Sequence, residues 1–232
     1  MYKNPIEHSE AVFRLASQLK HDNNQLIFHN NQIEFSEVIE KSGKSKLGVN
    51  LNLALNTLSP ACFFGLTVHE SEGNCVACVS ARKDNLGGQS LGEFLKKYFQ
   101  RICTSQSGMV ELAEVQPFHA RQPMHEVAYI GELWVAPAHR NLKLAKAIVK
   151  MAILLSLQIW AVDYIYALLS AKHMRVGPSQ YGWTRAYPRA LNWNTESIEI
   201  PADAGFVAIT GDEASDLARN IIDEQGLHTK TR

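Results

Sequence analysis

The residues best suited to chemistry lie in one segment, 127–158, which reads VAYIGELWVAPAHRNLKLAKAIVKMAILLSLQ. An apolar strand is predicted to run to Val135, and a long helix to begin near Asn141 or Leu142. The turn between them carries Pro137, His139 and Arg140. The N–H groups in the first turn of a helix have no partner within the helix, and the helix dipole is positive there. This turn is therefore a predicted anion-binding site.

Other elements must position this segment, and their order indicates the fold class. Helical patterns or helix-start signals occur at 5–20, 35–41, 90–103, 172–181 and 213–224. Strand-like runs occur at 25–28, 62–70, 75–82, 110–115, 127–135, 163–169, 183–193, 197–200 and 205–209. The order predicts an α/β (α+β) fold, in which a mixed, mostly antiparallel sheet is flanked by helices in a single domain.

Charge and cysteine content exclude several classes of protein. Lys+Arg and Asp+Glu are both 23 in the 232-residue chain, which argues against a broad nucleic-acid or membrane surface. No secretory signal is recognisable and the most apolar run, 151–162, is too short to cross a bilayer, so we expect a cytoplasmic protein. Cys62, Cys75, Cys78 and Cys103 are expected to be reduced, because the CVAC run at 75–78 lies in a strand and no second ligand pair follows at zinc spacing. No metal site is predicted.

The segment Leu133–Ala145, LWVAPAHRNLKLA, resembles the signature of the GNAT superfamily, the acyl-CoA N-acyltransferases. In that family a strand ends in Val-x-Pro-x-x-Arg, and Arg/Gln-x-x-Gly-x-Gly/Ala opens the following helix. Val135, Pro137, Arg140 and Ala145 fall in register with this signature. Gly182-Trp183 stands where the family often has Gly-Phe. The element order resembles the family over roughly residues 60–200. The division implied is an N-terminal helical extension over 1–59, an acyltransferase core over 60–210 and a C-terminal tail over 211–232.

The resemblance implies that acetyl-CoA binds along this segment as the acyl donor. Its pyrophosphate would contact the turn and first helical residues, and its pantetheine arm would pair with the end of the strand. The residues implied in binding are Leu133, Trp134, Val135, Arg140, Asn141, Leu142, Lys143, Leu144 and Ala145. Lys143 replaces the first glycine of the family signature, so its side chain either obstructs the phosphates or adds charge to them. Lys146 and Lys150 share its helix face, which is otherwise typical of a solvated stripe.

The family's proton donor to the leaving thiolate is a tyrosine a few residues before Gly-Phe. That position is Pro178 in this chain. Tyr181 is the nearest substitute and Tyr166 the second. The alternative interpretation of Tyr181 is an amphipathic packing residue.

A proton acceptor for the amine is the second catalytic group that the resemblance implies. Glu132 on the central strand is the first candidate, followed by Tyr129 and His139. Strand alternation places Glu132 and Tyr129 on opposite faces unless a bulge intervenes. The alternative interpretation of Glu132 is a carboxylate paired with Arg or Lys.

These residues together predict an N-acyltransferase that transfers an acetyl group to a small-molecule or peptide amine. Two alternatives stay open: a non-catalytic acyl-CoA-binding or regulatory module, and an enzyme that uses longer acyl chains or acyl-carrier protein. A homodimer is also left open. The acceptor pocket is expected to be built from loops at 29–59, 116–126 and 172–195. Trp183, Tyr187 and Trp193 form either an aromatic wall there or ordinary sheet packing.

Overall fold

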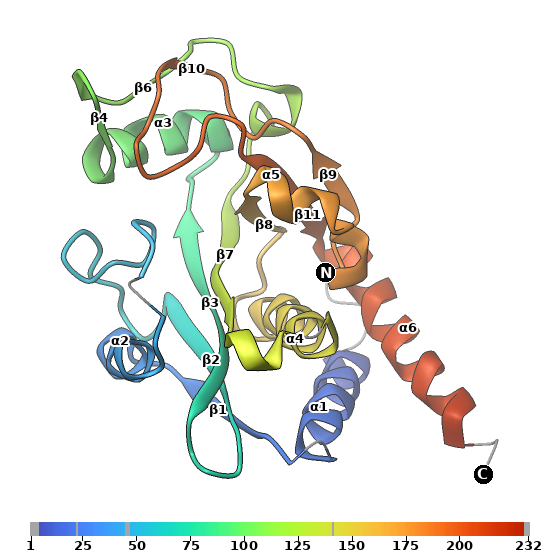
Figure 1. The fold of residues 1–232 in the computed structure, drawn as a ribbon. Coiled ribbons are helices and arrows are strands. Elements are labelled where there is room, and N and C mark those ends of the chain that lie inside the picture. Colours follow the sequence, from blue (N-terminus) through green and yellow to red (C-terminus); the bar gives the residue numbers. More distant parts are fainter. Residues whose placement is uncertain (1–4, 22, 45–46, 141, 230–232) are drawn as a thin grey trace.

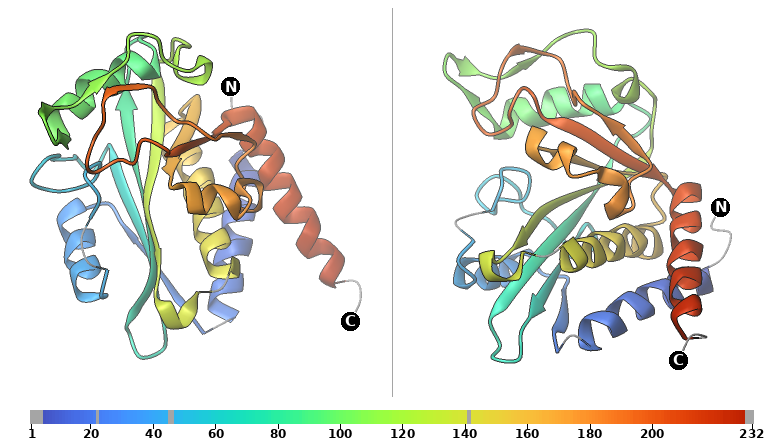
Figure 2. Two further views of the ribbon diagram at one scale, coloured as in Figure 1. Left: turned by 45° about the horizontal axis from the view of Figure 1, so that its top comes forward. Right: turned by 45° about the vertical axis from the view of Figure 1, so that its right-hand side comes forward.

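One twisted seven-stranded sheet, with helices packed on both faces, organises the chain (Figure 1; Figure 2). The computed structural model describes residues 5–21, 23–44, 47–140 and 142–229. Within them, every pairing in this sheet is antiparallel except that between β7 (Glu126–Val135) and β8 (Tyr164–Leu169). The predicted fold class, a mixed and mostly antiparallel sheet flanked by helices, is confirmed.

The helices and strands follow the predicted order closely. The helices are α1 (Pro5–His21), α2 (Gln32–Lys41), α3 (Leu91–Ile102), α4 (Leu142–Trp160), α5 (Ala171–Arg175) and α6 (Gly211–Thr229), with 3-10 turns η1 (Phe118–Ala120), η2 (Pro137–His139) and η3 (Pro178–Tyr181). In spatial order the central sheet contains β1 (Gln25–His29), β2 (Phe63–His69), β3 (Cys75–Asn85), β7, β8, β11 (Gly205–Thr210) and β9 (Arg185–Tyr187). Two small ribbons pair β4 (Thr104–Ser105) with β5 (Gly108–Met109), and β6 (Glu111–Leu112) with β10 (Trp193–Thr195).

Each face of the sheet has its own apolar core. Helices α1, α4 and α6 cover one face, and α2 and α3 cover the other (Figure 1). Successive strand residues divide between the cores, so that Phe64 lies in the first and Phe63 in the second. Helix α4 is buried in the first core, which explains its apolar sequence. Among the described residues, no helix is both long and apolar enough to cross a bilayer.

The N-terminal region adds a strand to the sheet as well as helices. Strand β1 runs antiparallel to β2, from Gln25 opposite His69 to His29 opposite Gly65. Gly65 is required by close packing, because a Cβ there would lie 2.2 Å from Cδ2 of Phe35 in α2. The expected boundary between residues 59 and 60 therefore leaves one strand of the sheet outside the core.

Three predicted strands are wrong or much shorter than expected. In 110–115 only Glu111–Leu112 is a strand, and it pairs with β10 outside the central sheet. In 183–193 only Arg185–Tyr187 joins the sheet. Residues 197–200 form a turn, because the Ser197 hydroxyl accepts hydrogen bonds from the backbone N–H of Glu199 at 3.0 Å and of Ile200 at 3.2 Å. Such local bonds compete with strand pairing.

Candidate active site

Strands β7 and β8 begin side by side and then separate. They pair only from Val127 opposite Tyr164 to Tyr129 opposite Tyr166, although β7 continues to Val135. A pocket of about 450 Å³ lies where they diverge. Both strands, helices α4 and α5, turn η3 and the loop after α2 line it. Its polar side chains are Lys44, Tyr129, Glu132, Ser170, His173 and Tyr181.

A β-bulge in β7 directs Glu132 into this pocket. The register with β3 shifts between the pairs Trp134–Cys78 and Gly131–Ser80, and Glu132 has a positive φ of 59°. A bulge interrupts the alternation of side chains. Glu132 and Tyr129 therefore line the same pocket, which is the exception to strand alternation that a bulge was expected to produce.

Both carboxylate oxygens of Glu132 have partners. Oε1 accepts a hydrogen bond from the backbone N–H of Gly48 at 2.8 Å, and Oε2 forms an ion pair with Nζ of Lys44. The Glu132 side chain is 6% exposed and that of Lys44 is 14% exposed. A carboxylate so deeply buried requires such partners. The ion pair that was the alternative interpretation of Glu132 is therefore present.

Tyr181 lines the pocket from turn η3. The turn starts after Gly177 and ends at Gly182, both with positive φ near 90°. A Cβ at Gly182 would lie 2.8 Å from Cδ2 of Leu217 in α6, so this glycine lets the turn pack against α6. Burial raises the pKa of Tyr181, which keeps its phenol protonated and able to donate. Glu132 and Tyr181, the two predicted catalytic residues, are brought together in one pocket.

Three polar side chains in the pocket, those of Lys44, Ser170 and His173, were not singled out from the sequence. Lys44 lies 88 residues before Glu132 in a polar segment without a motif. His173 lines the pocket from α5, and its Nδ1 lies 2.9 Å from the hydroxyl of Ser170. The short helix at 172–181 was expected, but nothing in its sequence indicated that a histidine would lie beside Glu132 and Tyr181.

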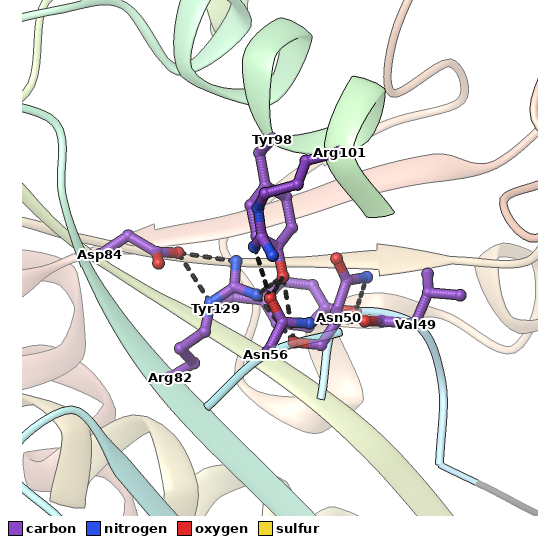
Figure 3. A network of polar contacts seen from close by, with 8 residues as sticks. All are labelled: Val49, Asn50, Asn56, Arg82, Asp84, Tyr98, Arg101 and Tyr129. Atoms are coloured by element: carbon purple, nitrogen blue, oxygen red, sulfur yellow. Dashed lines mark hydrogen bonds and ion pairs between the residues drawn. The ribbon is translucent and has the colours of Figure 1, made fainter. Parts of the chain in front are cut away.

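A buried polar cluster lies behind Tyr129 (Figure 3). Its centre is Arg82, which is 1% exposed and donates to Oδ2 of Asp84 from Nε at 3.0 Å and from Nη2 at 2.8 Å. Arg82 also donates to the Asn50 carbonyl at 2.8 Å and contacts the Tyr98 hydroxyl. The Tyr129 hydroxyl accepts a hydrogen bond from the Asn50 amide at 3.1 Å. The cluster thereby fixes one wall of the pocket.

The charges in this cluster are set by burial and pairing. Burial opposes the charge on Arg82, but the interactions with Asp84, Tyr166 and Tyr98 together outweigh it and hold the pKa of the guanidinium above its usual value. Burial also raises the pKa of Tyr129 well above that of a free tyrosine. The Tyr129 phenol therefore stays neutral, which suits a wall residue better than a base.

Tyr166 and His139, the remaining candidates for proton donor and proton acceptor, do not line the pocket. Tyr166 is fully buried, and its hydroxyl has no hydrogen-bond partner within the part of the chain that the structure describes. Its ring stacks on Phe206 with centroids 5.6 Å apart. Nε2 of His139 lies 3.2 Å from Oε2 of Glu70 in a separate cavity of about 320 Å³. Tyr166 is therefore a packing residue, and His139 belongs to the turn.

Of the three strand residues predicted to contact the acyl donor, one lines the pocket. Leu133 lines it and is 37% exposed. Trp134 and Val135 complete β7 opposite Cys78 and Ala77 of β3. On the β8 side, no strand pairs with β7 beyond Tyr129 among the described residues.

The predicted residues of the turn and helix differ in their surroundings. Arg140 is exposed. Asn141 and the side chain of Leu142 lie outside the described residues. Lys143 lines the cavity that contains His139, not the pocket between β7 and β8. Leu144 and Ala145 are buried at 6% and 8% exposure, so only their backbone groups could contact a phosphate.

The cysteines are structural in this arrangement. All four are free thiols, and Cys78 lies under the bulge, where its thiol donates to the Glu132 carbonyl oxygen at 3.2 Å. Burial raises the pKa of Cys78 far above its ordinary value, so the thiol is neutral and a poor nucleophile. In the described part of the chain, no three His, Cys, Asp or Glu side chains are grouped to hold a metal ion.

No protein-family model matches the chain, and no curated protein matches it in sequence. Solved structures with a similar architecture include NAA60 from Arabidopsis thaliana in complex with acetyl-CoA, which is 10% identical, has a TM-score of 0.44, and covers 80% of this chain and 98% of its own. A mutant spermidine N-acetyltransferase SpeG from Vibrio cholerae is 9% identical, with a TM-score of 0.45 and coverage of 83% and 96%.

A further similar structure is an acetyltransferase of the GNAT family from Staphylococcus aureus, 15% identical with a TM-score of 0.42, covering 81% of this chain and 98% of its own. At these identities and TM-scores the similarity assigns neither activity nor substrate.

Proposed function

We propose that this protein is an N-acyltransferase that moves an acyl group, most simply acetyl, from acyl-CoA to a primary amine. The observation that carries the proposal is the pocket between the diverging strands β7 and β8. A carboxylate, Glu132, and a protonated phenol, Tyr181, line the same space. Acyl transfer to an amine needs one group of each kind, because the amine loses a proton and the departing thiolate gains one.

The surroundings of the pocket suit an acyl-CoA thioester. Within the described part of the chain, the backbone of β7 beyond Tyr129 has no strand neighbour on the β8 side, and the amide groups of a pantetheine arm could pair with it as an added strand does. Arg140 is exposed just before α4, where the helix dipole favours phosphate. Lys143 lines another cavity, so its side chain does not obstruct the pocket between β7 and β8.

The residues of the chain have separable roles in this proposal. Glu132 accepts the proton of the amine, and the acceptor ammonium takes the position beside Oε2 that Lys44 holds. Tyr181 gives its phenolic proton to the leaving thiolate. The neutral Cys78 thiol favours direct attack by the amine over an acyl-cysteine intermediate. His173 lines the same pocket and is an alternative proton acceptor in this proposal.

The test combines binding and turnover. Acetyl-CoA binding is measured by calorimetry, and thiol release is followed across a panel of primary amines. Arg140→Ala should weaken binding, because it removes a cation beside the helix start. Arg189→Ala, an exposed arginine that does not line the pocket, serves as the matched control and should bind like the wild type.

Each outcome of this test has a defined meaning. Absence of acetyl-CoA binding would contradict the proposal in its acetyl-CoA form. Binding without thiol release would favour the non-catalytic module, for which the ion pair that occupies Glu132 is the structural argument. Release with longer acyl-CoA donors but not with acetyl-CoA would identify the longer-chain enzyme.

A further inference from the structure

We propose that Lys44 is a self-acylation site, at which the protein transfers the acyl group of bound acyl-CoA to its own lysine. This inference rests on the proposed acyltransferase function. It deepens that function by naming an acceptor, a primary alkyl amine supplied by the chain itself. The ligand required is the same acyl-CoA thioester.

The position of the Lys44 amine is the main evidence for self-acylation. Its Nζ contacts Oε2 of Glu132, and both side chains line the pocket that Tyr181 also lines. A primary amine, a proton acceptor and a proton donor are thus gathered in one space. Lys44 is the only lysine to line this pocket among the residues that the structure describes.

The loop after α2 holds this amine in place. The backbone N–H of Gly48, four residues further on, binds the other oxygen of the same carboxylate at 2.8 Å. The Lys44 side chain is 14% exposed, so it is already largely withdrawn from water. An amine fixed in this way reacts as though present at very high concentration, because little orientational freedom remains to be lost.

The reaction balances without any further reagent. The Lys44 ammonium gives a proton to the Glu132 carboxylate, and the freed lone pair attacks the thioester carbonyl carbon. A C–N bond forms and the C–S bond breaks. The thiolate takes the phenolic proton of Tyr181, and Tyr181 regains a proton from Glu132. The nitrogen loses its second proton to solvent as the amide forms. The products are an acyl-lysine amide, free CoA thiol and one proton released to solvent.

Acylation changes the site that it uses. The amide carries no charge, so Glu132 loses its cationic partner and keeps the hydrogen bond from Gly48. The carboxylate is then available to an external amine. Self-acylation would therefore convert a closed ion pair into an open acceptor site.

The test uses the full chain incubated with acetyl-CoA, followed by intact mass and peptide mapping. One acetyl group is expected on Lys44, formed at least about ten-fold faster than on Lys41, a matched exposed lysine in the same region that does not line the pocket. Lys44→Arg keeps the positive charge and should abolish this product, whereas Lys41→Arg should not change it. Glu132→Gln should slow it. Circular dichroism of each variant verifies the fold.

Other results would overturn the inference in distinguishable ways. Thiol release with external amines, with Lys44 unmodified throughout, would contradict self-acylation and leave the acyltransferase function intact. Equal acetylation of Lys44 and Lys41, or an unchanged rate in denatured protein, would mean chemical acylation only. Absence of acetyl-CoA binding in calorimetry would contradict both proposals together.

Discussion

Among the described residues that line the pocket, Glu132 is the only one other than glycine with a positive φ. Its φ of 59° is uncommon for a residue with a side chain, and such a conformation costs about 1 kcal/mol or more and persists only where its surroundings fix it. The strand pairs Trp134–Cys78 and Gly131–Ser80 fix it on either side. The bulge therefore directs the Glu132 carboxylate into the pocket. In a regular strand, alternation would place this side chain on the opposite face.

The sequence predicted some of these site residues and not others. Glu132 and Tyr181 were found because they lie on or near motif positions. Lys44 and His173 were missed because their roles come from chain segments that meet only in the folded molecule. A solitary lysine in a polar segment looks the same whether it is solvated or paired with a buried carboxylate.

Tyr181→Phe should reduce acyl transfer about 100-fold while leaving acetyl-CoA binding unchanged, because it removes only the proton donor. Burial raises the pKa of Tyr181, so the wild-type phenol stays protonated through neutral pH. The wild-type rate should fall only at a pH above the ordinary tyrosine pKa of about 10. The measurement is a pH–rate profile with thiol release as the signal.

In Tyr181→Phe that alkaline fall should disappear, since no phenol remains to ionise. Tyr187→Phe, which changes a tyrosine outside the pocket, is the control and should keep both the rate and the profile. An undiminished rate in Tyr181→Phe would show that the thiolate is protonated by another group.

Arg82→Met should lower the free energy of unfolding by about 3–5 kcal/mol, because it leaves the buried Asp84 carboxylate without its cation. The side chains of this pair are 1% and 13% exposed. Lys83→Met is the adjacent control, and its pair with Glu126 is 24% and 36% exposed. Exposed pairs contribute only about 0–1 kcal/mol, so urea unfolding should separate the two variants clearly.

Similar losses in the two variants would contradict a structural role for the cluster behind Tyr129. Thiol release by whatever fraction of Arg82→Met remains folded should also fall. The reason is that Asn50 links Arg82 to the wall residue Tyr129.

Helices and strands with strong local signals were predicted well. Helix α3 begins with a complete capping box between Ser90 and Glu93, and its apolar residues recur at helical spacing. Strand β7 and helix α4 lie where the apolar strand and the apolar stripe placed them. Short edge elements were predicted poorly, because their pairing depends on distant partners. The two-residue strand β6, for example, exists only through β10.

The carboxylate of Glu213 joins three elements at the end of the sheet. It accepts hydrogen bonds from the Thr210 N–H at 2.8 Å and the Thr184 hydroxyl at 2.9 Å, and it pairs with Arg185 at 3.2 Å. Partial burial alone would raise its pKa, but these donors outweigh burial and lower the pKa of Glu213. A carboxyl whose pKa is lower in the folded protein stabilises the fold when it is ionised.

Glu213→Gln should therefore reduce the free energy of unfolding by about 1–2 kcal/mol at neutral pH. This contribution is fully present above the unfolded-state pKa of about 4.3 and is lost as the pH falls through the lower folded-state pKa. Thermal unfolding from pH 7 to pH 3 should show the two proteins converging on the acidic side. A difference independent of pH would contradict the assignment, and Glu224→Gln, an exposed residue later in α6, is the control.

On the scale of the whole molecule, the sheet consists of two groups of strands. Strands β1, β2, β3 and β7 form one group, and β8, β11 and β9 form the other. They are joined by parallel pairing at only three residue positions, Val127–Tyr129 of β7 against Tyr164–Tyr166 of β8. The fold class followed from element order, but this partial junction did not. Two apolar strands predict pairing, and nothing in their residues indicates where the pairing stops.

A ligand that lies between β7 and β8 should tie the two groups of strands together and stabilise the whole molecule. At a concentration of 100 times its Kd, acetyl-CoA should add about 2.7 kcal/mol to the free energy of unfolding. For a chain of this size, that corresponds to a rise in Tm of roughly 5–10 °C. Inorganic pyrophosphate at the same concentration as acetyl-CoA bounds the contribution of anion binding, and in Arg140→Ala a given acetyl-CoA concentration should raise Tm less.

Hydrogen exchange, measured together with Tm, shows which part of the protein acetyl-CoA stabilises. Amide groups of β7 beyond Tyr129 should become protected with acetyl-CoA but not with pyrophosphate, because only the pantetheine arm reaches them. A rise in Tm without new protection in β7 would mean that acetyl-CoA binds at the turn before α4 alone. The gap between β7 and β8 would then not be the donor site, and the roles of Glu132 and Tyr181 in acyl transfer would lose their basis.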